Sequence, residues 1–129
     1  WHTYQRFNRR LFEERYLPWL SGHAAKDPSL GWYKGELWFF DNYIIPLANR
    51  LHQCGVFGVS YHEYVTYARE NRREWESKGV KIVSEMKAAC EEKYRSRLQA
   101  KIALEEASKE SQETLADVVS VRGNAASTA

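Results

Sequence analysis

Apolar side chains recur three and four residues apart along most of this chain. That spacing places them on one face of a helix. No stretch shows the strict alternation of apolar and polar residues that marks a half-buried strand, and no internal repeat is present. The pattern predicts an all-α fold.

The first predicted helix covers residues 4–17 and is amphipathic. Arginines and glutamates fill the steps between its apolar positions, which are Tyr4, Phe7, Leu11, Phe12 and Leu17. We expect the helix to end near Pro18, because proline has no N–H for the helical ladder. Residues 21–31 collect Gly, Pro, Asp and Ser without periodicity, which predicts a loop.

The second predicted helix covers about residues 32–53 and contains a proline. It is apolar nearly all round from Leu37 to Leu47, which predicts burial on most of its faces. Pro46 cannot donate the backbone bond to Asn42, so we expect a kink there. Gly55 is placed to cap the C-terminus.

The third predicted helix begins at Tyr61, where Ser60 and Glu63 have the spacing of a capping box. It should run to about Lys78, with Gly79 as a weak point. Residues 80–107 shift to Lys, Glu, Arg and Ala, which predicts a charged, exposed helical extension. A thin apolar stripe runs along it, formed by Val83, Met86, Cys90, Tyr94, Leu98 and Ile102. Residues 108–129 are expected to be weakly helical, with a disordered tail from residue 122.

Composition does not identify a partner, but it narrows the class of protein. The chain has 19 basic and 17 acidic side chains, a net charge of +2, so we expect no nucleic-acid partner. Cys54 and Cys90 lack the spacing of a metal site or a disulfide framework and are interpreted as reduced thiols of an intracellular protein. We find no membrane span and no secretory leader. Because the chain starts at Trp1 and its only methionine is Met86, we expect it to be a fragment.

Catalytic signatures are absent from the sequence. The four histidines are His2, His23, His52 and His62, and none is paired four residues from another or adjacent to an aspartate. Glycine-rich phosphate loops, nucleophile elbows and C-x-x-C pairs are also absent. We therefore assign no catalytic residue and no metal ligand in this chain.

One family nevertheless resembles the chain over roughly residues 1–79. The stretch "GELWFFDNYIIPLANRL" resembles the C-terminal part of the catalytic domain of class I 3′,5′-cyclic nucleotide phosphodiesterases. Glu36 falls at the position of the family's glutamine, Phe39 at that of its phenylalanine, and Pro46 begins its Pro-Leu pair. The segments "TYQRFNRRLFEERY" and "ENRREW" are similar to flanking motifs in the same order, the second with one extra residue. The resemblance implies a piece of a larger helical catalytic domain.

The resemblance also implies a site that grips a purine base. The residues at the family's pocket positions are Tyr4, Phe7, Asn8, Leu11, Glu36 and Phe39. Phe39 corresponds to one jaw of the clamp, Leu11 helps to form the other, and Glu36 reads the edge of the base. A flat base of this kind gains about 1–3 kcal/mol from stacking on such walls.

Glu36 departs from the family's glutamine. An ionised glutamate only accepts hydrogen bonds, whereas glutamine also donates. Guanine presents two adjacent donors and adenine presents one donor beside an acceptor, so we expect a preference for cGMP over cAMP. A protonated Glu36 would mimic glutamine and weaken that preference.

The family's chemistry depends on two divalent metal ions, of the zinc and the magnesium or manganese type, whose ligands precede Tyr4 in family order. None of the histidines here matches those motifs. We therefore expect the parent protein to be the enzyme and this chain alone to be inactive. The resemblance implies that the upstream part of the same catalytic domain is a partner of this chain. It also implies that any membrane attachment would be made by missing upstream domains.

Other interpretations remain open from the residues alone. The aromatic residues around Phe39 are often simply core, and Glu36 is often a solvent-facing carboxylate. The principal alternative is a non-catalytic interaction module that forms a homodimer through the stripe from Val83 to Ile102. A nucleic-acid binder that uses the first helix's arginines with Tyr4 and Trp19 is the weaker alternative, because the net charge is small.

Overall fold

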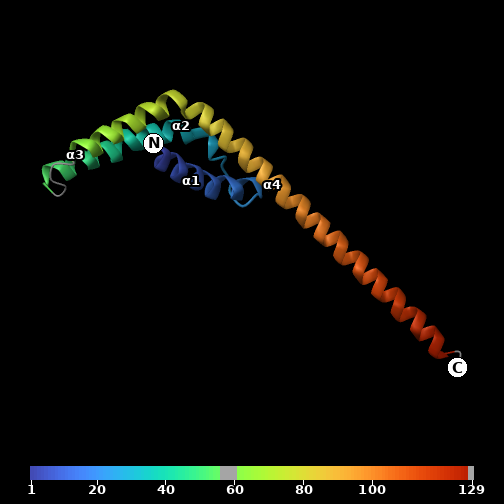
Figure 1. Cartoon of the computed structure of the whole chain (residues 1–129). Coiled ribbons are helices and arrows are strands. Elements are labelled where there is room, and N and C mark those ends of the chain that lie inside the picture. The colour runs from blue at the N-terminus through green and yellow to red at the C-terminus, as the bar shows by residue number, and fades with distance from the viewer. Residues whose placement is uncertain (56–60, 128–129) are drawn as a thin grey trace. The chain divides into compact units, whose positions relative to one another are not determined.

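The computed structural model describes residues 1–55 and 61–127, and within these ranges the chain forms helices joined by turns (Figure 1). The elements are α1 (His2–Leu20), α2 (Ser29–Phe39), the π-helical turn η1 (Phe40–Ile44), α3 (Ile45–Gln53) and α4 (Tyr61–Ser127). Two compact units divide the chain, unit 1 at Trp1–Glu92 and unit 2 at Lys93–Ala129. The predicted all-α fold class is confirmed.

Helix α1 continues through Pro18 and ends two residues later, at Leu20. The N–H of His23 donates to the carbonyl of Pro18 at 2.8 Å, and the N–H of Gly22 donates to the carbonyl of Trp19 at 3.0 Å. Gly22 has a φ of +78°, so these bonds form a Schellman motif. The expected end near Pro18 is therefore wrong, because the glycine and not the proline ends the helix.

The second predicted helix is interrupted where Pro46 removes a backbone donor. It divides into α2, η1 and α3, with Pro46 in the first turn of α3. The N–H of Ile45 donates to the carbonyl of Phe40, five residues earlier, which is the bonding of a π turn. We had predicted a kink at Pro46, and the structure has a π-helical turn before the proline. Gly55 caps α3 as predicted, with a φ of +65° and its N–H 3.0 Å from the carbonyl of His52.

The apolar stretch from Leu37 to Leu47 is not buried on most faces, so that prediction is wrong. Phe40 alone is buried among these residues, and neither α2 nor α3 contains a buried residue. Trp38 is 57% exposed and Leu47 is 58% exposed. Helical periodicity identifies an apolar surface but does not show that this chain covers it.

Helix α4 begins at Tyr61, as predicted, and Ser60 of the expected capping box lies outside the described residues. The helix passes through Gly79 and continues to Ser127. The expected end near Lys78 and the expected disordered tail over residues 122–127 are both wrong. Extending an existing helix adds one hydrogen bond per residue and avoids the cost of a new nucleus.

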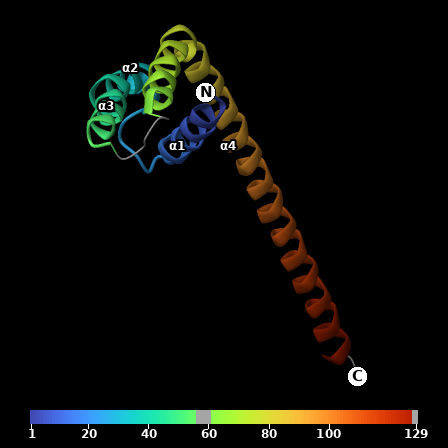
Figure 2. The same cartoon turned by 60° about the vertical axis from the view of Figure 1, so that its left-hand side comes forward.

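The core of unit 1 joins α1 and η1 to α4, and α1 lies next to α4 in both views (Figures 1 and 2). The buried core residues are Phe12, Tyr16, Phe40, Trp75, Ile82, Val83, Met86 and Cys90. The Tyr16 hydroxyl donates to Glu91 at 3.0 Å across the same interface. Residues 80–92 therefore belong to the core of unit 1, where we had expected an exposed extension from residue 80.

Gly79 allows α4 to pack closely against the Tyr33 ring of α2. The N–H of the Trp75 ring donates to the carbonyl of Tyr33 at 3.1 Å, and the Tyr33 hydroxyl donates to the carbonyl of Glu76 at 2.9 Å. A Cβ added at Gly79 would lie 2.7 Å from the Tyr33 ring and 2.9 Å from the Trp75 ring. The weak point expected at this glycine is instead a contact point between α2 and α4.

Length alone does not make a membrane helix of α4. Across residues 1–55 and 61–127, no helix combines the length and the apolar composition that crossing a bilayer requires.

Candidate functional site

A chain of hydrogen bonds links α1 to α2 in unit 1. The ring N–H of Trp32 donates to Oδ1 of Asn8 at 3.1 Å, and Nδ2 of Asn8 donates to the Tyr4 hydroxyl at 3.3 Å. The Tyr4 hydroxyl then donates to Oε2 of Glu36. The structure thus brings together Tyr4, Asn8 and Glu36, which the sequence resemblance assigned to one site.

The donor groups determine the direction in which these hydrogen bonds run. A tryptophan ring can only donate, so it holds the Asn8 amide with its oxygen toward Trp32 and its nitrogen toward Tyr4. The Tyr4 oxygen therefore accepts from Asn8, and its own proton is directed to Glu36. Asn8 is 2% exposed, and these two bonds satisfy both ends of its buried amide. Glu36 is held as a hydrogen-bond acceptor.

Helical spacing explains why four residues converge. Tyr4 and Asn8 are four residues apart on α1, and Trp32 and Glu36 are four residues apart on α2. Residues four apart lie on the same helix face, one turn from each other. Each helix therefore contributes one pair, and the two pairs meet where α1 and α2 pack.

Burial changes the acidity of the Tyr4 hydroxyl and the Glu36 carboxyl, which are the last two groups of this series of hydrogen bonds. Burial raises the pKa of the Glu36 carboxyl above its ordinary value, while hydrogen bonding by Tyr4 and Asn8 opposes the rise. Burial, together with the bond to Glu36 and its charge, raises the pKa of the Tyr4 hydroxyl. The tyrosine proton consequently stays on Tyr4, and Glu36 takes up a proton more readily than an exposed glutamate does.

A groove of about 380 Å³ opens beside Glu36 in unit 1. It is lined by Leu11, Arg15, Pro28, Gly31, Trp32, Gly35, Glu36, Trp38 and Phe39. Apolar rings and one aliphatic side chain supply most of the walls, with one carboxylate and one guanidinium among them. Such a combination suits a flat, mostly apolar ligand that carries a few polar groups.

Phe39 and Leu11 lie on this groove, and Phe7 does not. Phe39 is 44% exposed and stacks on Tyr43, with ring centroids 5.6 Å apart and planes inclined by 29°. Phe7 is 63% exposed and lies on a separate depression of α1, which shares only Leu11 with the groove. The structure thus joins Leu11, Glu36 and Phe39 in one cavity and leaves Phe7 beside it.

Sequence reasoning missed three residues of this site. Trp32 orients Asn8, Trp38 lines the groove, and Arg15 brings a positive charge from among the arginines between the apolar positions of the first helix. The spacing contained part of the signal, because Trp32 precedes Glu36 by one helical turn and Arg15 follows Leu11 by one turn.

The described residues do not fit a metal centre. No group of three or more His, Cys, Asp or Glu side chains is placed to hold an ion in residues 1–55 and 61–127. His52 and His62 have ring centroids 5.8 Å apart, but two imidazoles alone fall short of the three or four protein ligands of a typical zinc site.

No protein-family model, curated protein or solved structure matches this chain. The groove, its hydrogen-bond chain and the sequence resemblance are therefore the basis for a functional proposal.

Proposed function

We propose that this chain is the C-terminal part of the catalytic domain of a class I 3′,5′-cyclic nucleotide phosphodiesterase, and that the groove at Glu36 binds the purine base. One observation carries the proposal. Tyr4, Asn8 and Glu36 are hydrogen-bonded beside a groove that Leu11 and Phe39 also line. The resemblance assigned these five positions to a base pocket from sequence alone, and they come from two different helices.

The walls of the groove suit a purine. Phe39 offers an exposed aromatic face, Leu11 offers an aliphatic one, and the Trp32 and Trp38 rings extend the apolar lining. A purine is flat and apolar on both faces, and stacking is tolerant of which base is bound. Selectivity between bases must therefore come from the group that meets the base edge, which is Glu36.

Glu36 favours a base edge that donates. Tyr4 occupies one lone pair of the carboxylate, and the remaining lone pairs can accept from a ligand. Guanine offers N1–H and the 2-amino group side by side, whereas adenine offers one donor beside an acceptor. We therefore expect cGMP to bind more tightly than cAMP while Glu36 is ionised.

Hydrolysis requires groups that the described residues do not supply. In the proposed parent enzyme, two divalent ions would activate the attacking water and stabilise the charge that develops on the phosphate. The role of the groove in this chain is to bind and orient the base. We expect the chain of residues 1–129 to bind cyclic nucleotide and to hydrolyse none.

The test is titration of the chain of residues 1–129 with cGMP, followed by NMR of its tryptophan ring N–H signals. We expect the Trp32 signal to shift and Phe39→Ala to weaken binding by about fivefold or more, which is the lower end of a base-stacking contribution. Phe7→Ala is the matched control, because Phe7 is also exposed but lies outside the groove. Equal losses in the two variants, or no shift at millimolar cGMP, would contradict the proposal.

A further inference from the structure

The groove beside Glu36 carries a positive charge as well as a negative one. Arg15 of α1 and Glu36 of α2 both line it. Within residues 1–55 and 61–127, the Arg15 guanidinium forms no hydrogen bond or ion pair, whereas Arg9 on the same helix contacts Glu85 at 3.5 Å. The N–H donors of Arg15 are therefore available to a ligand.

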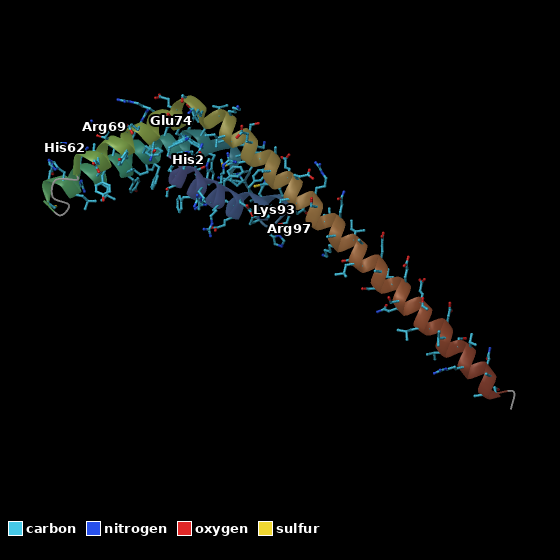
Figure 3. All side chains as sticks on the ribbon, viewed as in Figure 1. His2, His62, Arg69, Glu74, Lys93 and Arg97 are labelled. Atoms are coloured by element: carbon cyan, nitrogen blue, oxygen red, sulfur yellow. The ribbon has the colours of Figure 1, made fainter. Side chains whose placement is uncertain are left out.

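The two charges belong to different ends of the groove, because α1 and α2 run in opposite directions. Tyr4 donates to Glu36, whereas Asn8, one turn later on α1, accepts from Trp32, one turn earlier on α2. Figure 3 labels His2, which lies at the end of α1 that carries the bond to Glu36. Moving along α1 from this end leads toward the first residues of α2.

Arg15 lies about three turns after Tyr4, or about 16 Å along the axis of α1. Side chains of a helix tilt toward its N-terminus. The Arg15 side chain therefore tilts back toward the position of Leu11, and the Glu36 side chain tilts back toward that of Trp32. Both charged groups lean toward the middle of the groove without forming an ion pair with each other. A ligand that lies along the groove can meet both charges at once.

Two glycines leave the middle of the groove open. Gly31 and Gly35 stand one turn apart on α2, and both line the groove. A Cβ added at either glycine would have no atom of another side chain within 4 Å. The space between the two charges is therefore free for a flat ligand.

We propose that Arg15 binds the phosphate of the cyclic nucleotide whose base lies at Glu36, so that the ligand lies lengthwise in the groove. The proposal rests on the proposed function of the groove and adds a contact that the resemblance does not assign. A 3′,5′-cyclic nucleotide carries the donor edge of its base and its negatively charged phosphate on opposite parts of the molecule. The planar guanidinium matches two phosphate oxygens, while Glu36 accepts from the base.

The two charges also determine which way round the nucleotide binds. The reversed orientation would set the phosphate against the carboxylate of Glu36, and like charges placed together disfavour binding. Of the described residues that line the groove, Arg15 is the only basic one and Glu36 is the only acidic one. Asp27 lies just before α2, but its Oδ1 accepts from the N–H of Ser29 at 2.8 Å and is not paired with Arg15.

The test compares cGMP with guanosine, which has the same base and no phosphate. The chain of residues 1–129 is titrated with each, and binding is followed by NMR of the tryptophan ring N–H signals. Arg15→Gln should weaken cGMP binding by about threefold to tenfold at low salt and leave guanosine binding unchanged. Added salt should weaken cGMP binding more in the original chain than in Arg15→Gln, because salt screens the exposed guanidinium.

Two further variants keep the outcome specific. Arg10→Gln is the matched control, because Arg10 is also exposed on α1 but lines the separate depression at Phe7. It should leave the affinities for both ligands unchanged. Arg15→Lys keeps the charge and loses the planar fork, so its cGMP affinity should fall between those of the original chain and Arg15→Gln. Circular dichroism checks that each variant remains helical.

Three results would overturn the phosphate contact while leaving the base site in place, provided that Phe39→Ala still weakens both ligands. The first is unchanged cGMP affinity in Arg15→Gln. The second is an equal loss of cGMP and guanosine affinity in Arg15→Gln, and the third is an equal loss of cGMP affinity in Arg10→Gln. Binding of neither ligand to the original chain would contradict the base site and the phosphate contact together.

Discussion

Helix α4 passes through both units, and the two parts of it are stabilised differently. In unit 1 it contributes Trp75, Ile82, Val83, Met86 and Cys90 to a core shared with α1 and η1. In unit 2 every residue from Arg95 to Ser127 is exposed. Residues of unit 1 are held by tertiary packing, while the described residues of unit 2 depend on helical hydrogen bonds and on side-chain pairs four residues apart.

Helix α4 is continuous, but it is not a uniform structural element. The same backbone geometry carries a face that the chain buries and a face that it leaves open. Substitutions in the two parts of α4 should therefore change stability by different amounts, and sometimes in opposite directions.

Replacing Trp75 should give the largest effect. Its side chain is fully buried and donates to the carbonyl of Tyr33. Trp75→Ala should lower the free energy of unfolding by about 3–5 kcal/mol through the lost packing and the cavity that remains. Leu104→Ala, at a residue 70% exposed in unit 2, is the control. Urea unfolding followed by circular dichroism measures both, and similar losses would remove the distinction between the units.

Two glycines of α4 offer a matched comparison with opposite signs. Gly79→Ala should destabilise by about 1–3 kcal/mol, because the new Cβ would overlap the Tyr33 and Trp75 rings. Gly123→Ala has nothing within 4 Å and should increase helix stability by about 1 kcal/mol. Urea midpoints report the first change, and helical ellipticity reports the second. Stabilisation by Gly79→Ala would show that the core of unit 1 is looser than the structure indicates.

The ion pair between Asp41 and Arg72 should give the smallest effect and a pH dependence. Arg72 donates two hydrogen bonds to Asp41, at 2.6 and 3.1 Å, and this holds the pKa of the Asp41 carboxyl below its ordinary value. The lowered pKa means that the pair stabilises the fold above the ordinary pKa of aspartate, and that this contribution is lost as pH falls through the folded-state pKa.

Asp41→Asn should therefore cost about 1 kcal/mol or less near pH 7, since both partners are partly exposed. Urea unfolding of both proteins at neutral pH and again at about pH 2 measures the difference, which should disappear in acid. A difference that persists in acid would mean that Asp41 acts through something other than its charge.

Local signals in the sequence predicted much of the fold. The start of α4 at Tyr61 agrees with the prediction. Gly55 caps α3 as predicted, because a glycine cap depends on residues close by in the chain. The end of α1 was missed because the Schellman motif at Gly22 governs it and Pro18 does not. Proline removes one backbone hydrogen bond in the helix, but only two residues of α1 follow Pro18, so little helix depends on the bond that is lost.

The burial of side chains was harder to predict than the positions of the helices. The stretch from Leu37 to Leu47 and the stripe beginning at Val83 are both apolar at helical spacing. The first is largely exposed, whereas the second is buried at Val83, Met86 and Cys90. Periodicity identifies a face, whereas burial depends on which distant element meets it.

The candidate site was predicted in part for a similar reason. Tyr4, Asn8 and Glu36 came from the resemblance, and the structure joins them. Trp32 was missed because its role depends on how α2 packs on α1, which spacing along one helix cannot reveal. Phe7 also came from the resemblance. An amphipathic helix needs apolar residues at both Phe7 and Leu11, so only the fold separates the two.

The most direct test of the account is the ratio of cGMP to cAMP affinity in the chain of residues 1–129 and in Glu36→Gln, measured by calorimetry at neutral pH. Glutamine keeps a carbonyl for the Tyr4 hydroxyl and adds a donor, so the hydrogen-bond chain can survive while the group that meets the base edge changes. The account predicts that the original chain prefers cGMP and that Glu36→Gln reduces the preference. Tighter binding of cAMP, with a ratio that Glu36→Gln leaves unchanged, would contradict it.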